Sequence, residues 1–155
     1  MKIASMAIAL MALSSAAHAW EPSLLVYGAS DHIGHYTNMR KQQINPGVGL
    51  EAATSGWLLG AGVYRDSYTR TAYMAYGGYR WTLPIGDDWR VALSARGGYL
   101  NGSGYHGLVA APTVGIGYKR GFVEASVFPS HHGRGLIIGL WFRYQFDDVS
   151  STASK

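Results

Sequence analysis

Two neighbouring residues, Asp66 and Ser67, are the most promising candidates for chemistry, because they lie in a short polar segment between two strand-like arms. A serine hydroxyl can attack an ester or position an acceptor when a base takes its proton. An imidazole, which ordinarily titrates at about pH 6.5, is the usual base, and a carboxylate can orient it. The residue types therefore make Asp66 and Ser67, with His32 as the base, candidate catalytic residues for chemistry at a hydroxyl group.

The residues beside this pair are suited to holding an anionic substrate. Arg65 and Arg70 flank it, and a guanidinium binds phosphate groups well. Tyr68 is the third candidate substrate-binding residue. The alternative is a structural role, because Asp and Ser are both favoured in tight turns. In that case His32 would be a solvated loop residue.

The elements that must position these residues are β-strands. On both sides of the tip, over 57–64 and 72–81, strand-forming residues fall into two alternating sets with a period of two. Each arm has the length of about 9–11 residues with which a tilted strand crosses a bilayer. The full set of expected strands is 24–30, 48–53, 57–64, 72–81, 89–100, 108–118, 122–128 and 136–146.

Composition favours a membrane barrel over a soluble fold. Charged residues make up 14% of the chain, against about 25% in typical soluble domains, while Gly and Tyr are abundant at 21 and 11 residues. No later segment approaches 18 consecutive apolar residues, so no spanning helix is expected. These features predict an all-β, eight-stranded antiparallel transmembrane β-barrel; a soluble exported β-sandwich is the alternative.

The first 19 residues have the features of a secretory signal peptide. A positive start precedes a short apolar run, and the segment ends in Ala17-His18-Ala19, which predicts cleavage after Ala19. The expected organisation is a signal peptide at 1–19, a barrel at 20–146 and a polar tail at 147–155. The barrel is expected in the bacterial outer membrane, as a monomer, with no nucleic-acid partner.

The lengths of the connections predict which of them share a rim. Connections after the even strands are short, whereas 31–45, 101–107 and 129–135 are longer and contain the histidines. Outer-membrane barrels have short periplasmic turns and longer outer loops, so these segments and 66–70 are expected at one outward rim. Polar residues at inward phase are expected to pair with each other, above all Glu124 with an interior arginine. The inward set is Arg90, Arg96, Glu124, Arg143 and Gln145.

Two short stretches resemble a known family. The closing strand 141–146 reads Trp-Phe-Arg-Tyr-Gln-Phe, and 64–68 reads Tyr-Arg-Asp-Ser-Tyr, followed by Gly-Gly-Tyr-Arg-Trp at 77–81. Both are similar to the lipid A palmitoyltransferase (PagP-like) family of outer-membrane barrels. The resemblance implies transfer of an acyl chain from phospholipid to lipid A without a cofactor, with Asp66, Ser67 and His32 at the family's functional positions. The segment before the first strand is too short for the family's amphipathic helix.

A second resemblance concerns the segment after the first strand. His35-Tyr36-Thr37-Asn38, with Glu51 further on, is similar to a motif of the lipid A 3-O-deacylases. This resemblance implies a hydrolytic triad of His35, Thr37 and Glu51, with Thr in place of Ser.

Three functions therefore remain open: a lipid A acyltransferase, a lipid A deacylase, and a non-enzymatic barrel. Outer-membrane lipids are the expected partners, and the aromatic closing strand is of the kind that the barrel-assembly machinery recognises. The pair His131-His132 is not a metal-site signature, because adjacent strand residues face opposite ways, and no metal is expected.

Overall fold

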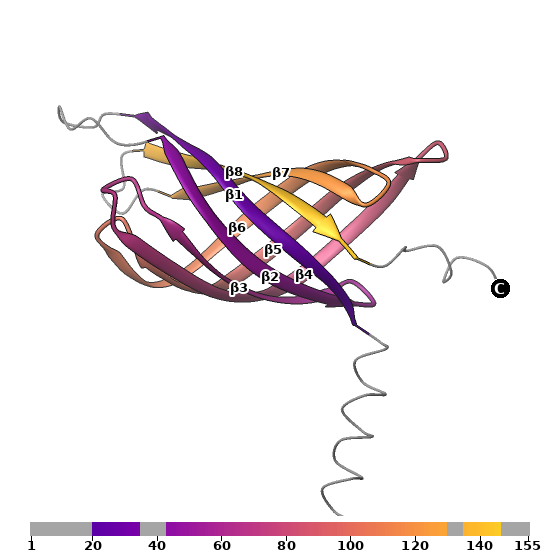
Figure 1. Ribbon diagram of the computed structural model, residues 1–155, viewed down its shortest axis with the longest axis horizontal. Helices are drawn as coiled ribbons and strands as arrows, with labels where there is room; N and C mark the ends of the chain where they lie inside the picture. The colour runs from indigo at the N-terminus through magenta and orange to yellow at the C-terminus, as the bar shows by residue number, and fades with distance from the viewer. Residues whose placement is uncertain (1–19, 35–42, 130–134, 147–155) are drawn as a thin grey trace, which may run out of the picture.

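The computed structural model describes residues 20–34, 43–129 and 135–146, which form one closed antiparallel barrel (Figure 1). Each strand pairs with its neighbours in sequence, and β1 pairs with β8 to close the barrel. The predicted all-β, eight-stranded architecture is confirmed. The strands are β1 (Glu21–Gly34), β2 (Ile44–Thr54), β3 (Trp57–Arg65), β4 (Thr71–Ile85), β5 (Trp89–Gly102), β6 (Tyr105–Tyr118), β7 (Gly121–Pro129) and β8 (Gly135–Gln145).

The barrel has two different rims. The loop rim, at the left in Figure 1, is where β1, β3, β5 and β7 end, and the turn rim, at the right, holds the connections after β2, β4 and β6. The backbone N–H of Ser103 donates to Asp66, and Ser67 lies beside His32 of β1, so the tips after β3 and β5 and the end of β1 meet at the loop rim as expected. Among the described residues, no helix is long and apolar enough to cross a membrane.

Most strands are longer than the sequence pattern predicted. The segment 101–107 was expected to be a loop, but β5 and β6 continue to a two-residue turn at Ser103 and Gly104. Both residues have positive φ, 54° and 76°, as a tight hairpin turn that follows the strand twist requires. Likewise, residues 83–85 were expected in a turn but belong to β4. The strands extend beyond their predicted ends because cross-strand hydrogen bonding continues into residues whose side-chain alternation is weak.

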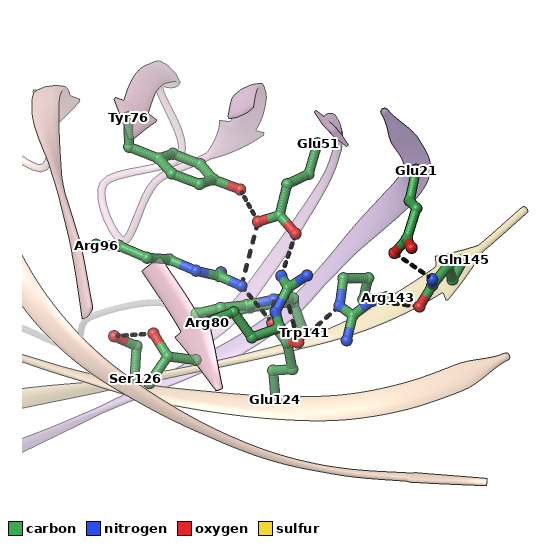
Figure 2. Close-up of polar contacts among 11 residues, drawn as sticks. Glu21, Glu51, Tyr76, Arg80, Arg96, Glu124, Ser126, Trp141, Arg143 and Gln145 are labelled. Carbon is green, nitrogen blue, oxygen red and sulfur yellow. Dashed lines mark hydrogen bonds and ion pairs between the residues drawn. The ribbon is translucent and has the colours of Figure 1, made fainter. Parts of the chain in front are cut away.

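Apolar side chains cover the outside, and the interior near the turn rim is polar. Glu124 is 1% exposed and accepts hydrogen bonds from Arg143 Nε at 2.7 Å, Arg96 Nη2 at 2.7 Å and Trp141 Nε1 at 3.0 Å (Figure 2). The predicted pairing of Glu124 with interior arginines is confirmed. A buried carboxylate is tolerated here because these donors replace water.

A second carboxylate, Glu51, extends this network across the barrel. It accepts a hydrogen bond from Tyr76 Oη at 2.9 Å, pairs with Arg80, and lies 3.2 Å from Arg96 Nη2 (Figure 2). Arg96 therefore bridges both carboxylates. We call Glu51, Tyr76, Arg80, Arg96, Glu124, Trp141 and Arg143 the interior network.

Two glycines of β3 make room for interior rings. A Cβ at Gly60 would overlap the Tyr76 ring, and a Cβ at Gly62 would overlap the Tyr27 ring. Glycines in a strand can leave space for a ligand or allow a bend. At Gly60 and Gly62, the space is filled by tyrosines of the barrel itself.

Candidate functional site

Ser67 and His32, 35 residues apart in the chain, meet inside the loop rim. The Ser67 hydroxyl lies 3.4 Å from His32 Nε2, and Ser67 is 6% exposed. This distance is long for a hydrogen bond, as is common for catalytic pairs before substrate binds. The arrangement has the geometry of a hydroxyl next to its base.

A β-bulge at Gly28 turns the His32 side chain into the barrel. The register of β1 against both β2 and β8 shifts between Tyr27 and Ala29. Leu25 and Tyr27 face inward before the bulge, and strict alternation would then turn Ala29 inward and His32 outward. The extra residue reverses the phase, so that Ser30 and His32 line the interior instead. Bulges commonly redirect a side chain beside a functional site.

Asp66 holds the tip that carries Ser67. One carboxylate oxygen accepts the backbone N–H groups of Tyr68 and Arg70, at 2.9 and 2.8 Å, and the other accepts the backbone N–H of Ser103 at 2.6 Å. Asp66 as a whole is 1% exposed. It therefore joins the β3–β4 tip to the β5–β6 turn. This is an observed structural role, and the predicted orientation of the imidazole by Asp66 stays a prediction.

The three candidate substrate-binding residues occupy different parts of the rim. Arg70 and Tyr68 line the barrel cavity next to Ser67. Arg65 is exposed, and its Nε donates to the Thr69 carbonyl at 3.2 Å. The position of Arg70 at the cavity mouth makes it the better placed of the two guanidiniums for a bound anion.

A cavity of about 670 Å³ extends from Ser67 and His32 into the barrel, toward the turn rim. Its wall is mostly apolar and includes Met74, Leu100, Val109 and Phe128. Gly102, the last residue of β5, lies six residues from Arg96 (102 − 96 = 6). At about 3.4 Å per residue and a tilt of about 35–45°, the cavity is roughly 14 to 17 Å deep.

The interior network forms the floor of this cavity. Tyr76, Arg96 and Trp141 line the cavity and also belong to the network. The Arg96 guanidinium lies 5.1 Å from the Trp141 ring and 5.4 Å from the Tyr76 ring. Cation–π contacts and ion pairs fix these side chains, so the cavity ends at a rigid boundary.

The wall of the cavity is incomplete between β6 and β7. Among the described residues, the β6–β7 register ends at the Thr113–Ser126 pair, although β6 begins at Tyr105 and β7 continues to Pro129. Proline has no N–H to donate, and Pro112 follows the last pair. The Ser126 hydroxyl donates to the Pro112 carbonyl at 2.7 Å and closes the end of the ladder.

The residues of the alternative triad are not brought together in the part of the chain that the structure describes. His35 and Thr37 lie outside the described residues, and Glu51 belongs to the interior network, 3% exposed. His131 and His132 also lie outside them. Within the described ranges, no group of three or more His, Cys, Asp or Glu side chains is arranged to hold a metal ion.

Sequence reasoning missed two residues that support the site. Asn45 accepts a hydrogen bond from Ser30 Oγ at 2.6 Å and donates to the Arg65 carbonyl at 3.0 Å, which ties β1 and β2 to the end of β3. Tyr27 packs beneath the mouth against Tyr64, with ring centroids 5.7 Å apart. The alternation of Leu25 with Tyr27 in the first expected strand was a signal for Tyr27, whereas Asn45 lay outside the expected strand 48–53.

Comparisons with known proteins add information on the fold alone. No protein-family model matches the sequence, and no curated protein matches it. Among solved structures, the chain is similar to the solution NMR structure of the de novo designed TMB2.3, with 17% identity and a TM-score of 0.47. That similarity covers 82% of this chain and 96% of the designed one.

Proposed function

We propose that the barrel spans the bacterial outer membrane, after removal of residues 1–19, and transfers an acyl chain from a phospholipid to lipid A. Support for the membrane comes first from aromatic residues on the outer surface. Trp89 and Tyr99, at opposite ends of β5, are 49% and 41% exposed. Ten residues separate them (99 − 89 = 10), which corresponds to roughly 24 to 28 Å of height, close to the apolar band of about 25 Å.

The outer surface between these aromatic residues also favours lipid. Within the described strands, the exposed side chains between the two rims are apolar, and examples are Leu59, Leu93, Val114 and Phe142. A charge at mid-depth would cost about 2–4 kcal/mol against lipid. The charged side chains of the described residues lie inside, in the interior network, or at the rims.

The single observation that carries the acyl-transfer proposal is the Ser67–His32 pair at the mouth of a deep apolar cavity. The depth of roughly 14 to 17 Å matches one leaflet of a bilayer whose hydrocarbon core is about 30 Å thick. An acyl chain in the cavity would place its ester carbonyl at the mouth, beside the Ser67 hydroxyl. Arg70, which lines the same mouth, is suited to a lipid phosphate.

The chemistry follows from these positions. Ser67 Oγ attacks the ester carbonyl of the donor while His32 takes the hydroxyl proton, and that proton passes to the departing lysophospholipid oxygen. A hydroxyl of lipid A then attacks the acyl-serine ester and gives its proton to His32, which returns it to Ser67 Oγ as the product leaves. Neither a metal nor a redox cofactor is needed for this sequence of steps.

The interrupted wall between β6 and β7 supports a lipid donor. The cavity is lined there by Ala110 and Ala111 of β6 and by Phe128 and Pro129 of β7. Above the Thr113–Ser126 pair, the described parts of β6 and β7 form no further ladder pairs, and an acyl chain would pass sideways from the bilayer into the cavity there.

Mass spectrometry tests this function directly. The folded protein in vesicles is given lipid A and a phospholipid with an isotope-labelled acyl chain. We expect lipid A to gain the mass of one labelled chain, with an equal amount of lysophospholipid formed. Loss of a chain from lipid A, or no change in lipid A, would overturn the proposal.

Deleting Gly28 should abolish activity by turning His32 outward. The deletion removes the bulge, so residues after Tyr27 return to strict alternation and the imidazole faces lipid. We expect the acyl-transfer rate of the folded fraction to fall by at least about 10²-fold, as loss of a base does. The matched control is Gly28→Ala, since a Cβ there meets only the Leu140 carbonyl at 3.6 Å. Equal rates in the two variants would show that the bulge is irrelevant.

Filling the cavity floor should shorten the acyl chain that is accepted. Ala111 is 6% exposed, pairs with Arg96 across β5 and β6, and lines the cavity just above the floor. In Ala111→Phe, we expect the rate with the longest accepted chain to fall about 10- to 200-fold, and shorter chains to be less affected. Ala75→Phe, on the outer face of β4, is the control. A uniform loss for all chain lengths would contradict the assignment.

A further inference from the structure

A second cleft lies at the turn rim, at the opposite end of the barrel from Ser67. It has a volume of about 540 Å³ and surrounds the turn between β6 and β7. Its lining residues are Asp88, Arg90, Tyr118, Lys119, Arg120, Gly121 and Tyr144. None of them belongs to the candidate site or to the interior network.

Hydrogen bonds between separate segments hold this cleft in shape. The backbone N–H of Lys119 donates to the Asp88 carbonyl at 2.9 Å, which joins the β4–β5 and β6–β7 turns. The backbone N–H of Gln145 donates to the Arg120 carbonyl at 2.9 Å and adds the end of β8. Three parts of the chain thus contribute to one preformed concave surface.

The lining combines positive charge with exposed aromatic rings. Three cationic side chains and one anionic side chain leave a formal charge of +2 (3 − 1 = 2). Lys119 Nζ lies 5.3 Å from the centroid of the Tyr118 ring. The Tyr118 ring packs on the Trp89 ring, with the two ring centroids 5.2 Å apart. Tyr118 and Tyr144 are 46% and 38% exposed on the outer face.

We propose that this cleft binds the phosphodiester headgroup of a phospholipid in the leaflet at the turn rim. The proposal rests on the membrane placement proposed above, in which the rings of Trp89, Tyr118 and Tyr144 lie at headgroup level. Lys119, which lies over the Tyr118 ring, contacts the phosphate, and Arg90, at the inward phase of β5, adds positive charge from the barrel mouth. The two tyrosines pack against the glycerol and the first methylenes. A free phosphate would leave these apolar ring faces uncovered, so the lipid is the better fit.

NMR of the folded barrel in a non-ionic, phosphate-free detergent tests this assignment. Short-chain phosphatidylglycerol is titrated in, and the backbone amides of Gly121 and Lys119 are followed. We expect saturable shifts at these amides, none with the matching phosphate-free diacylglycerol, and at most weak shifts with inorganic phosphate. Equal affinity for inorganic phosphate, or shifts confined to the loop rim, would overturn the proposal.

Variants separate the charge contribution from general lipid binding. In Arg90→Gln combined with Lys119→Gln, we expect the affinity at the Gly121 amide to fall at least about tenfold. Lys119→Arg, which keeps the charge, should bind like the unaltered protein. An unchanged affinity in the double variant would contradict the proposal. Because the readout is binding at the turn rim, it is independent of whether the Ser67 site transfers acyl chains.

Discussion

Replacing either Ser67 or His32 with alanine should stop acyl transfer while the barrel remains folded. General-base catalysis raises a reaction rate by about 10²- to 10⁴-fold. We therefore expect His32→Ala to lower the acyl-transfer rate by that factor, and Ser67→Ala to lower it by at least as much. The two side chains act as a unit across a 3.4 Å contact. The double variant should therefore lose no more than the worse single variant, because the effects of residues that act together do not add.

Two variants serve as controls for this experiment. His106→Ala removes an exposed histidine of β6 near the same rim, and Ser94→Ala removes a buried inward-facing serine of β5. Both should keep the acyl-transfer rate within a factor of about two to three, as expected for positions that do not touch the reacting groups. If Ser67→Ala and His32→Ala retain the rate of these controls, the site assignment is wrong.

Neutralising Glu124 should cause the largest loss of stability. Its carboxylate accepts from Arg96, Arg143 and Trp141, and Arg80 Nη2 lies 3.9 Å away. In Glu124→Gln, three buried arginines would face only one carboxylate, Glu51. Breaking a buried ion pair by removing one partner costs about 3–5 kcal/mol, and we expect that decrease in the free energy of unfolding, measured by urea titration in lipid vesicles.

The matched control for Glu124 is Glu21. Glu21 accepts one hydrogen bond, from Gln145 at 2.9 Å, near the turn rim. Glu21→Gln should cost about 1 kcal/mol, since it weakens one partly buried hydrogen bond. Combining Glu124→Gln with Arg143→Met should recover part of the lost stability, because it also removes a buried unpaired charge. Equal unfolding midpoints for the two single Gln variants would show that the interior network does not stabilise the barrel.

Much of the fold could be predicted from side-chain alternation. In a membrane barrel, the polar face of a strand must point inward and its apolar face must point toward lipid. This alternation can be read from each segment of the sequence without knowing its neighbours. Glu124, Arg96 and Arg143 were assigned to the interior on that basis, and they meet there. Strand ends were predicted less well, because the pairing of residues 83–85 and 101–102 depends on hydrogen bonds to the neighbouring strand rather than on side-chain type.

The sequence by itself determined the barrel, and it predicted that the end of the first strand and the tips after the third and fifth strands share one rim. The catalytic roles of His32 and Ser67 stay a prediction. Only the tertiary structure decided that His32 faces inward, because the bulge at Gly28 reverses the alternation and is visible only in the register with β2 and β8. It also decided that Glu51 joins the interior network and that the network closes the cavity, since both depend on which strands become neighbours when the barrel closes.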